Sequence, residues 1–186
     1  TYENWAHKVL TPAAYQAVEQ RYGQAPGSLL AKDGKLAVAC MQYGNILIFP
    51  QPRAAVGEDD YKMVHGVDVP PPHTYLAPYL YMQEEFGADI LIHFGTHGSL
   101  EFTPGRDAAM RPDDWSYALV GDRPHFYFYT TGNVGEGVIA KRRTHAALVS
   151  HLTAPYVESG MRQKYGELLE QIPKAIALEG NDNQLV

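Results

Sequence analysis

The chain has 186 residues, a formal net charge of -6 at pH 7 and 45% hydrophobic residues, values typical of a globular protein with its own core. The acidic balance argues against a nucleic-acid binder, because neutralising phosphates requires a basic face. Cys40 is the only cysteine, which excludes an intrachain disulfide and a cysteine-based zinc site and favours a reducing, cytoplasmic setting. No secretion signal and no run of about 18 apolar residues is visible, so we expect no membrane span.

The first 50 residues predict a helix followed by a hairpin. Thr11 and Pro12 are suited to cap and begin a helix that runs to Tyr22. The segments KLAVACM and NILIFP are typical of two strands, with a turn at Gly44 between them.

The middle of the chain predicts a loop, a helix and a strand. Segment 51–72 is rich in Pro, Gly and acidic residues and is long for a loop. Residues 74–86 carry apolar side chains on one face of a helix that Gly87 ends, with Pro78 delaying or kinking its first turn. The apolar run ADILIHF then predicts a strand covered on both faces.

The second half continues the alternation of strands and helices. GTHG leads to a short helix closed by Pro104 and Gly105, and HFYFYT is the next strand. TGNVGEG leads into a helix that we expect to run to about Leu152, and residues 160–179 predict one or two further helices with a break at Pro173.

This order predicts an α/β fold, with an open, mostly parallel sheet flanked by helices and a helical C-terminal segment. We expect an α/β core over residues 1–155, and a helical segment with a polar tail over residues 156–186. The chain starts without Met and ends soon after the polar GNDNQLV, so we interpret it as an excised piece that continues into a larger protein.

The stretch ILIHFGTHGSLEFTPG places His93, His97 and Glu101 at intervals of four residues. Gly95 and Gly98 argue against one continuous helix. We expect the three side chains to converge at the carboxyl end of the strand, where open α/β sheets bind ligands. Two imidazoles and a carboxylate suit zinc, cobalt or iron(II), or act as bases without a metal ion. The alternative is structural: the glutamate caps the short helix and the histidines bond loop carbonyls.

A second group of polar residues lies in GNVGEGVIAKRRTHAALVSHL. Projected as one helix, Arg142 and His145 fall within its apolar stripe, so they must be paired or line a cleft. We interpret Gly135 and Gly137 as part of a glycine-rich loop whose free N–H groups favour anions. An anionic ligand satisfies all of these groups. The alternative is an ion pair of Arg142 with a nearby carboxylate, with its neighbours Lys141 and Arg143 solvated.

Two common types of site are not supported by the sequence. It contains no G-x-x-x-x-G-K-[ST] motif, so any ATP is expected on another polypeptide. It also has no G-x-S-x-G motif for a serine nucleophile.

Three motifs in order resemble the CobN and magnesium-chelatase H-subunit family: PPPH at 70–73, FGADILIHFGTHGSLEFTPG at 86–105 and GEGVIAKRRTHAALVSHL at 135–152. These are the large tetrapyrrole-binding subunits of ATP-dependent metal chelatases. The resemblance implies a porphyrin or corrin substrate with acidic side chains, and exchange of cobalt, magnesium or iron at its ring nitrogens. It also implies ATP hydrolysis by separate AAA+ partner subunits. This chain resembles an internal portion of such a subunit and is expected to be inactive alone.

By motif, the resemblance carries His93, His97 and Glu101 into the family signature H-x-G-x-H-G-x-L-E, where we expect metal delivery or acceptance of the two pyrrole protons. His73 belongs to P-P-P-H and supports that site. The residues expected to bind the substrate are His73, Arg142, Arg143, His145, Gly135 and Gly137.

The motif details leave the metal and the direction of exchange open. Thr96 and Phe102 resemble the magnesium type, whereas Val134, Val138 and Ile139 depart from the third family motif. CobN-like proteins of haem utilisation, which remove iron, therefore stay an alternative. A non-catalytic tetrapyrrole-binding module and an independent metal-dependent hydrolase are further alternatives; the hydrolase needs three ligands and an open position for water.

Overall fold

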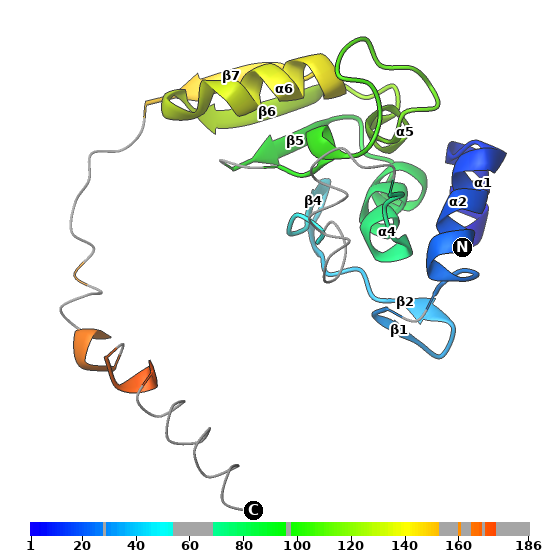
Figure 1. Cartoon of the computed structure of the whole chain (residues 1–186), viewed down its shortest axis with the longest axis horizontal. Coiled ribbons are helices and arrows are strands. Elements are labelled where there is room, and N and C mark those ends of the chain that lie inside the picture. Colours follow the sequence, from blue (N-terminus) through cyan, green and yellow to red (C-terminus); the bar gives the residue numbers. More distant parts are fainter. Residues whose placement is uncertain are drawn as a thin grey trace, which may run out of the picture. The chain divides into compact units, whose positions relative to one another are not determined.

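A computed structural model describes residues 1–27, 29–53, 69–95, 98–152, 160, 165–168 and 170–173 of the chain (Figure 1). The chain divides into two compact units, Thr1–Leu152 and Thr153–Val186. In the second unit, residues 165–168 and 170–173 are helical, and the rest of the helices expected over 160–179 lies outside the described residues. No helix in the described ranges is long and apolar enough to cross a membrane.

In its described residues, the first unit contains two small hairpins, a parallel sheet and the helices around them. Its elements are α1 (Tyr2–Val9), α2 (Pro12–Tyr22), β1 (Ala31–Lys32), β2 (Lys35–Leu36), β3 (Met41–Tyr43), β4 (Ile46–Ile48), α4 (His73–Tyr81), the π-helix η1 (Met82–Phe86), β5 (Leu91–Phe94), the 3₁₀-helix η2 (Leu100–Phe102), α5 (Trp115–Val120), β6 (His125–Thr130), the 3₁₀-helix η3 (Thr131–Asn133), α6 (Val134–Thr144) and β7 (Ala147–His151).

Among the described residues, the main sheet has three parallel strands in the order β5-β6-β7, which confirms the predicted α/β class. Helix α6 connects β6 to β7 and lies along the sheet (Figure 1), as the crossover between two parallel strands requires. His93 of β5 pairs with Tyr127 of β6. Because side chains alternate along a strand, both point to the same face of the sheet, the face that α6 and η2 cover.

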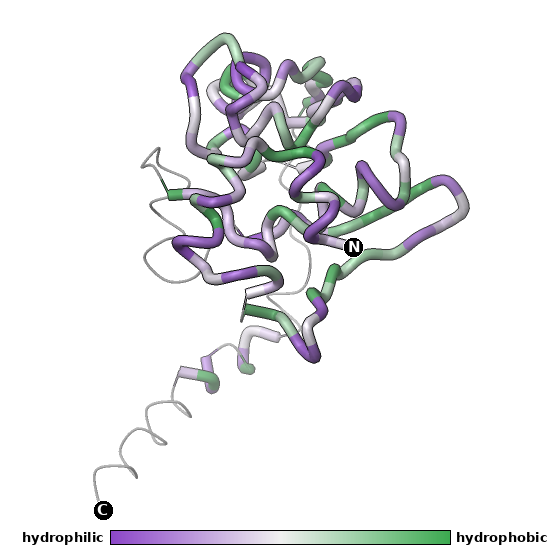
Figure 2. The backbone as a smooth tube through the Cα atoms, turned by 90° about the vertical axis from the view of Figure 1, so that its right-hand side faces the viewer, coloured by the Kyte–Doolittle hydropathy of each residue, from purple (hydrophilic) through white to green (hydrophobic). Residues whose placement is uncertain are grey.

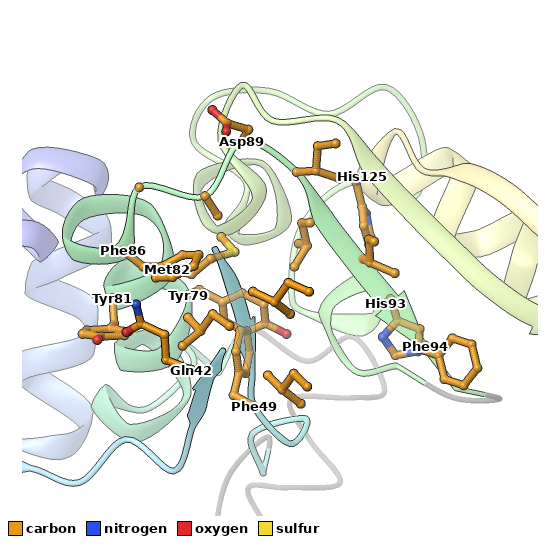
Figure 3. A pocket seen from close by; sticks show the side chains of 18 of the residues that line it. Gln42, Phe49, Tyr79, Tyr81, Met82, Phe86, Asp89, His93, Phe94 and His125 are labelled. Carbon is orange, nitrogen blue, oxygen red and sulfur yellow. The ribbon is translucent and has the colours of Figure 1, made fainter. Parts of the chain in front are cut away.

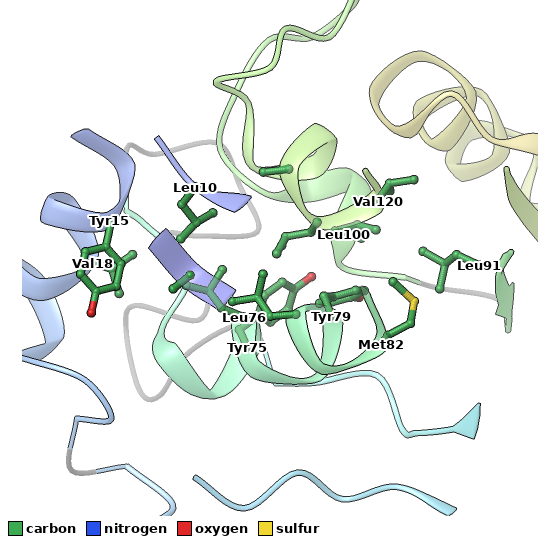
Figure 4. Packing of buried hydrophobic residues seen from close by; sticks show 14 residues of the cluster. Leu10, Tyr15, Val18, Tyr75, Leu76, Tyr79, Met82, Leu91, Leu100 and Val120 are labelled. Carbon is green, nitrogen blue, oxygen red and sulfur yellow. The ribbon is translucent and has the colours of Figure 1, made fainter. Parts of the chain in front are cut away.

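The apolar core of this unit is built around α4. Leu76 and Leu80 of α4 are fully buried and pack with residues of α1, α2 and α5 (Figure 4). The predicted helix start at Thr11 is confirmed, since its hydroxyl accepts a hydrogen bond from the Ala14 N–H at 3.2 Å and Pro12 occupies the first turn. Coloured by hydropathy, the backbone shows apolar segments interleaved with polar ones throughout this unit (Figure 2).

Several predicted elements are confirmed with modified boundaries. The turn at Gly44 and the expected strand NILIFP are confirmed by β4 in the antiparallel hairpin of β3 and β4. The expected strand KLAVACM does not form as one strand: residues 35–36 belong to β2, residues 37–40 are not in a strand, and β3 begins at Met41. The helix expected over 74–86 is α4 continued by η1, and Gly87 ends it in the left-handed conformation, which glycine adopts without steric cost. The short helix before Pro104 is η2. Of the loop predicted at 51–72, residues 54–68 lie outside the described part.

Two expectations were wrong. The helix expected to reach Leu152 ends at Thr144, where His145 turns into the left-handed region with φ 51°, and residues 147–151 form β7 instead. The strand β5 is covered on one face only: Ile92 and Phe94, which point away from α6, are 58% and 82% exposed. In both cases, pairing and packing across the chain determined the structure of a segment that the local pattern left ambiguous.

Candidate active site

The stretch after β5 places two of its three predicted residues together on one side of the sheet. His93 stands at the carboxyl end of β5 and Glu101 in η2, and both line the same cavity. His97 and Thr96 lie outside the described residues. The convergence of His93 and Glu101 beyond the strand end is thus as predicted, while the place of His97 stays a prediction.

Glu101 is a buried acidic residue, 1% exposed. The Tyr127 hydroxyl donates a hydrogen bond to its Oε1 at 2.7 Å and accepts one from the Gly98 N–H at 3.1 Å. Gly98 passes so close that a Cβ there would lie 2.5 Å from Oε2 of Glu101. Only glycine allows the backbone to approach the carboxylate in this way.

Burial raises the pKa of Glu101 above its ordinary value, because the ionised form loses solvation. Hydrogen bonds from the backbone N–H of Glu101, the Tyr127 hydroxyl and the backbone N–H of Gly98 act in the opposite direction, and the nearby carboxylate of Glu136 raises the pKa further. A carboxylate with a raised pKa binds a proton more readily than an exposed one, so this group is suited to accept protons.

The aromatic ring of Tyr127 joins the glutamate to the histidine. The imidazole of His93 stacks on this ring with centroids 4.3 Å apart and planes 12° from parallel. Tyr127 is fully buried, and burial raises the pKa of its hydroxyl, with the Glu101 carboxylate acting in the same direction. The hydroxyl therefore stays protonated and remains the donor to Glu101.

His125, on the same face of β6, has a fixed tautomer. The Thr144 hydroxyl donates to the Ala140 carbonyl at 2.7 Å, so its oxygen accepts from Nδ1 of His125 at 3.0 Å. The ring proton is on Nδ1, and Nε2 is buried without a hydrogen-bond partner in the described part of the chain. Burial is the main cause that lowers the pKa of His125 to about 4; a hydrogen bond to the Thr144 backbone acts against it, and the nearby His93 adds to the lowering.

A cavity of about 1200 Å³ adjoins these side chains. Figure 3 shows His93 and His125 on its strand side, and Tyr79, Met82 and Phe86 of α4 and η1 on the other. Ligand pockets commonly measure about 300–1,000 Å³ and combine apolar walls with a few polar groups. The cavity is therefore large enough for a substantial organic molecule.

The polar groups of α6 do not lie as predicted. Arg142 and His145 are exposed, because the single long helix that placed them in an apolar stripe does not form. Gly135 and Gly137 belong to the first turns of α6 rather than to a loop. Gly137 is buried, and a Cβ there would lie 2.7 Å from the ring of Tyr129, so close packing of α6 on the sheet explains this glycine.

Arg143 binds backbone oxygens. Its Nη2 donates to the carbonyl of Thr103 at 2.7 Å and its Nε to the carbonyl of Arg106 at 3.1 Å. The guanidinium therefore ties the loop after η2 to α6.

His73 lies in a different part of the unit. Its Nε2 donates to the Gly23 carbonyl at 2.9 Å, which leaves Nδ1 to accept from the Tyr2 hydroxyl at 2.7 Å. Its two ring nitrogens thus connect α1, the end of α2 and α4, and it is 2% exposed. The geometry given by these bonds is that of a structural histidine.

Three residues near the glutamate were missed from sequence: Tyr127, His125 and Glu136. The alternating pattern HFYFYT indicates that His125 and Tyr127 share a face, but which face lies under Glu101 depends on the parallel register. Glu136 stands in the GEG of the third motif, and its charge acts on both Glu101 and Tyr127. Position in a family motif was the one signal that could have identified it.

The described residues contain no group of three or more His, Cys, Asp or Glu side chains placed to hold a metal ion. Because His97 is not among them, the predicted set of His93, His97 and Glu101 is neither confirmed nor excluded. The described geometry offers a buried carboxyl group with a raised pKa, an imidazole stacked on the tyrosine that binds this group, and a cavity that both line.

The profile of the CobN/Magnesium Chelatase family matches residues 1–185. The chain belongs to this family. It is 35% identical over 161 residues to the H-subunit of magnesium chelatase from Rhodobacter capsulatus, covering 87% of this chain and 14% of that protein. To the aerobic cobaltochelatase CobN protein of Pseudomonas aeruginosa it is 36% identical over 153 residues, covering 82% of this chain and 12% of that protein.

A solved structure is similar as well. The catalytic subunit of cobaltochelatase from Mycobacterium tuberculosis has a TM-score of 0.71 and 32% sequence identity, and the similarity covers 97% of this chain and 16% of that one. The chain thus spans about one seventh of the length of the relatives it matches. The predicted family is confirmed, with magnesium-type and cobalt-type relatives at comparable identity.

Proposed function

We propose that this chain forms part of the metal-exchange site of a large chelatase subunit. In this proposal the subunit binds a porphyrin or corrin and inserts cobalt or magnesium, while AAA+ partner subunits hydrolyse ATP. The observation that carries the proposal is the buried Glu101 carboxylate, held beside His93 at a cavity of about 1200 Å³. The names of the matched relatives support the metal-chelatase class.

The chemistry requires a proton acceptor and a ligand for the incoming ion. When a divalent metal enters a porphyrin, two ring N–H bonds break and two protons leave, while the nitrogens bind the metal; a corrin, which binds metal as a monoanion, releases one. Glu101 accepts one of these protons at its carboxylate, since burial raises its pKa. The imidazole of His93, and His97 according to its motif, presents neutral nitrogen to the metal or accepts the second proton.

Arg142 is the proposed anchor for an acidic side chain of the tetrapyrrole. It is exposed in the last turn of α6, where a planar guanidinium is available for a bidentate contact with a carboxylate. Glu136 lies six residues earlier on the same helix, about 9 Å along its axis. Six residues also turn the helix by about 600°, so the two side chains point about 120° apart. The proposed contact of Arg142 with the substrate periphery therefore rests on its exposure and its motif position.

Absorption spectroscopy tests the binding part of this proposal. Porphyrins and a corrin precursor, metal-free and metal-loaded, are titrated into the chain, and we expect a saturable spectral shift. Arg142→Met should weaken binding at least tenfold while changing the free energy of unfolding by no more than about 0.5 kcal/mol, as expected for an exposed side chain. Binding by the Arg142→Met variant equal to wild type would remove this residue from the proposal.

Metal exchange is tested in the complete large subunit with its ATPase partners. Glu101→Gln should abolish insertion while tetrapyrrole binding stays within about twofold, and Glu3→Gln, an exposed glutamate of α1, is the matched control. Normal insertion by Glu101→Gln would refute the proposed role. Release of iron from haem, with no insertion of cobalt or magnesium, would instead support the haem-utilisation alternative. Binding without exchange in either direction would indicate a non-catalytic module.

A further inference from the structure

We propose that Tyr127 is the positioning residue of this site, orienting the Glu101 carboxylate and the His93 ring toward the cavity. This inference rests on the proposed function of Glu101 and His93, and it assigns a role to a residue outside the three motifs that carry the family resemblance. Tyr127 is fully buried in the central strand β6, the strand with a neighbour on each side and so the most constrained of the sheet.

The hydroxyl of Tyr127 has both of its hydrogen-bonding functions in use. Its hydrogen is directed at Oε1 of Glu101, 2.7 Å away, and its oxygen accepts the Gly98 N–H at 3.1 Å. A single hydroxyl thereby binds both the carboxylate and the backbone at Gly98. A carboxylate can only accept hydrogen bonds, so the tyrosine hydroxyl is the donor. This hydrogen bond orients the Glu101 side chain.

The ring of Tyr127 orients the histidine. His93 and Tyr127 are register partners on adjacent parallel strands, and their rings stack at 4.3 Å with a 12° angle between planes. The stack restricts the plane of the imidazole, and its nitrogens therefore lie in a plane nearly parallel to the tyrosine ring. One side chain thus contacts the end of β5, Gly98 and the η2 helix.

Hydroxyl removal separates positioning from packing. Tyr127→Phe keeps the ring, its stack on His93 and nearly all of its volume, but it removes the hydrogen bond from the hydroxyl to Oε1 of Glu101. Proximity effects are steep, so that a displacement of about 1 Å costs about a hundredfold in rate. We expect kcat for metal insertion by the complete chelatase to fall ten- to a hundredfold, while KM for the tetrapyrrole changes less than twofold.

The matched control is Tyr129→Phe. Tyr129 lies two residues further along β6 on the same face and packs on Gly137, so it reports the effect of losing a tyrosine hydroxyl from this strand. We expect wild-type kcat and KM for this variant. Should both variants lose kcat equally, the effect would be one of the strand in general, and the positioning role would be overturned.

The outcomes also separate this inference from the proposed function. Wild-type kcat in Tyr127→Phe, together with loss of insertion in Glu101→Gln, overturns the positioning role and leaves the function of Glu101 intact. Insertion by both variants overturns the function itself. If Tyr127→Phe does not fold, site-specific replacement of Tyr127 by 3-fluorotyrosine keeps the ring and hydroxyl but strengthens the donor. A change in kcat of more than twofold at constant KM supports the proposal, and an unchanged kcat overturns it.

Discussion

The buried imidazole of His125 makes a specific prediction about acid stability. A histidine whose pKa is lower in the folded state than in the unfolded chain binds fewer protons when folded. Its contribution to stability is therefore present above the unfolded pKa of 6.5 and is lost as the pH falls toward the folded pKa of about 4. We therefore expect protonation of His125 to lower the free energy of unfolding as the pH falls from about 6.5 toward about 4.

The size of this decrease follows from the pKa values of His125 in the unfolded and the folded chain. From about pH 7.5 to about pH 5, the linkage relation gives a loss of about 2 kcal/mol, rising to about 3 kcal/mol once the pH is below 4. Glu101 works in the opposite direction, because its pKa is raised and its contribution is lost as the pH rises through the folded value. The pH dependence of wild-type stability is thus the sum of the contributions of His125 and Glu101. A variant is needed to isolate the contribution of the histidine.

His125→Asn removes the titrating ring, and urea unfolding followed by circular dichroism at the two pH values gives the difference. The variant loses packing volume and is expected to be less stable overall, but its loss of stability between about pH 7.5 and pH 5 should be smaller than that of wild type by about 2 kcal/mol. His145→Asn removes an exposed histidine from the end of α6, where asparagine tolerates the left-handed backbone, and should retain the wild-type slope.

Equal slopes for wild type and His125→Asn would refute the reasoning, since they would mean that the ring is as readily protonated in the folded chain as in the unfolded one. A hydrogen-bonded Nδ1, together with an Nε2 that has no partner among the described residues, is the structural basis of the prediction. An altered slope in His145→Asn of the same size would show that the assay responds to any histidine.

Three substitutions test the packing around the site. Gly98→Ala places a Cβ 2.5 Å from the Glu101 carboxylate and should lower the free energy of unfolding by about 1–3 kcal/mol. Gly137→Ala, whose Cβ would meet the Tyr129 ring at 2.7 Å, should cost a similar amount; an unchanged urea midpoint for either variant would mean that the contact is absent. Arg143→Met removes two hydrogen bonds to backbone carbonyls and should cost about 1–3 kcal/mol in the same assay, whereas a loss of tetrapyrrole binding alone would restore its predicted substrate role.

Local signals predicted the elements whose ends are determined by a few neighbouring residues. The side-chain cap at Thr11 and the left-handed Gly87 were both found where the sequence placed them. In each case the decisive interaction lies within a few residues along the chain, so the information is present in a short window.

The segment after His145 shows where such windows fail. Residues 146–152 have apolar side chains at helical spacing as well as at strand spacing. The helical interpretation predicted a longer α6, with Arg142 on its apolar face. In the structure, residues 147–151 pair with β6 instead, and the arginine is exposed. The segment forms a strand because β6, about 20 residues earlier in the chain, is available to pair with it. The local periodicity of the sequence carries no information about such a distant partner.

The site illustrates the same limit with a functional consequence. The motif residues His93 and Glu101 are eight positions apart, and their convergence followed from the turn between them. Tyr127 comes from the next strand, and it reaches them because β5 and β6 pair in parallel with His93 opposite Tyr127. A slip of one residue in this register would bring Phe126 or Phe128 opposite His93 and turn the tyrosine hydroxyl away from the carboxylate. The chemistry proposed for Glu101 therefore depends on a pairing between strands that the motif itself does not encode.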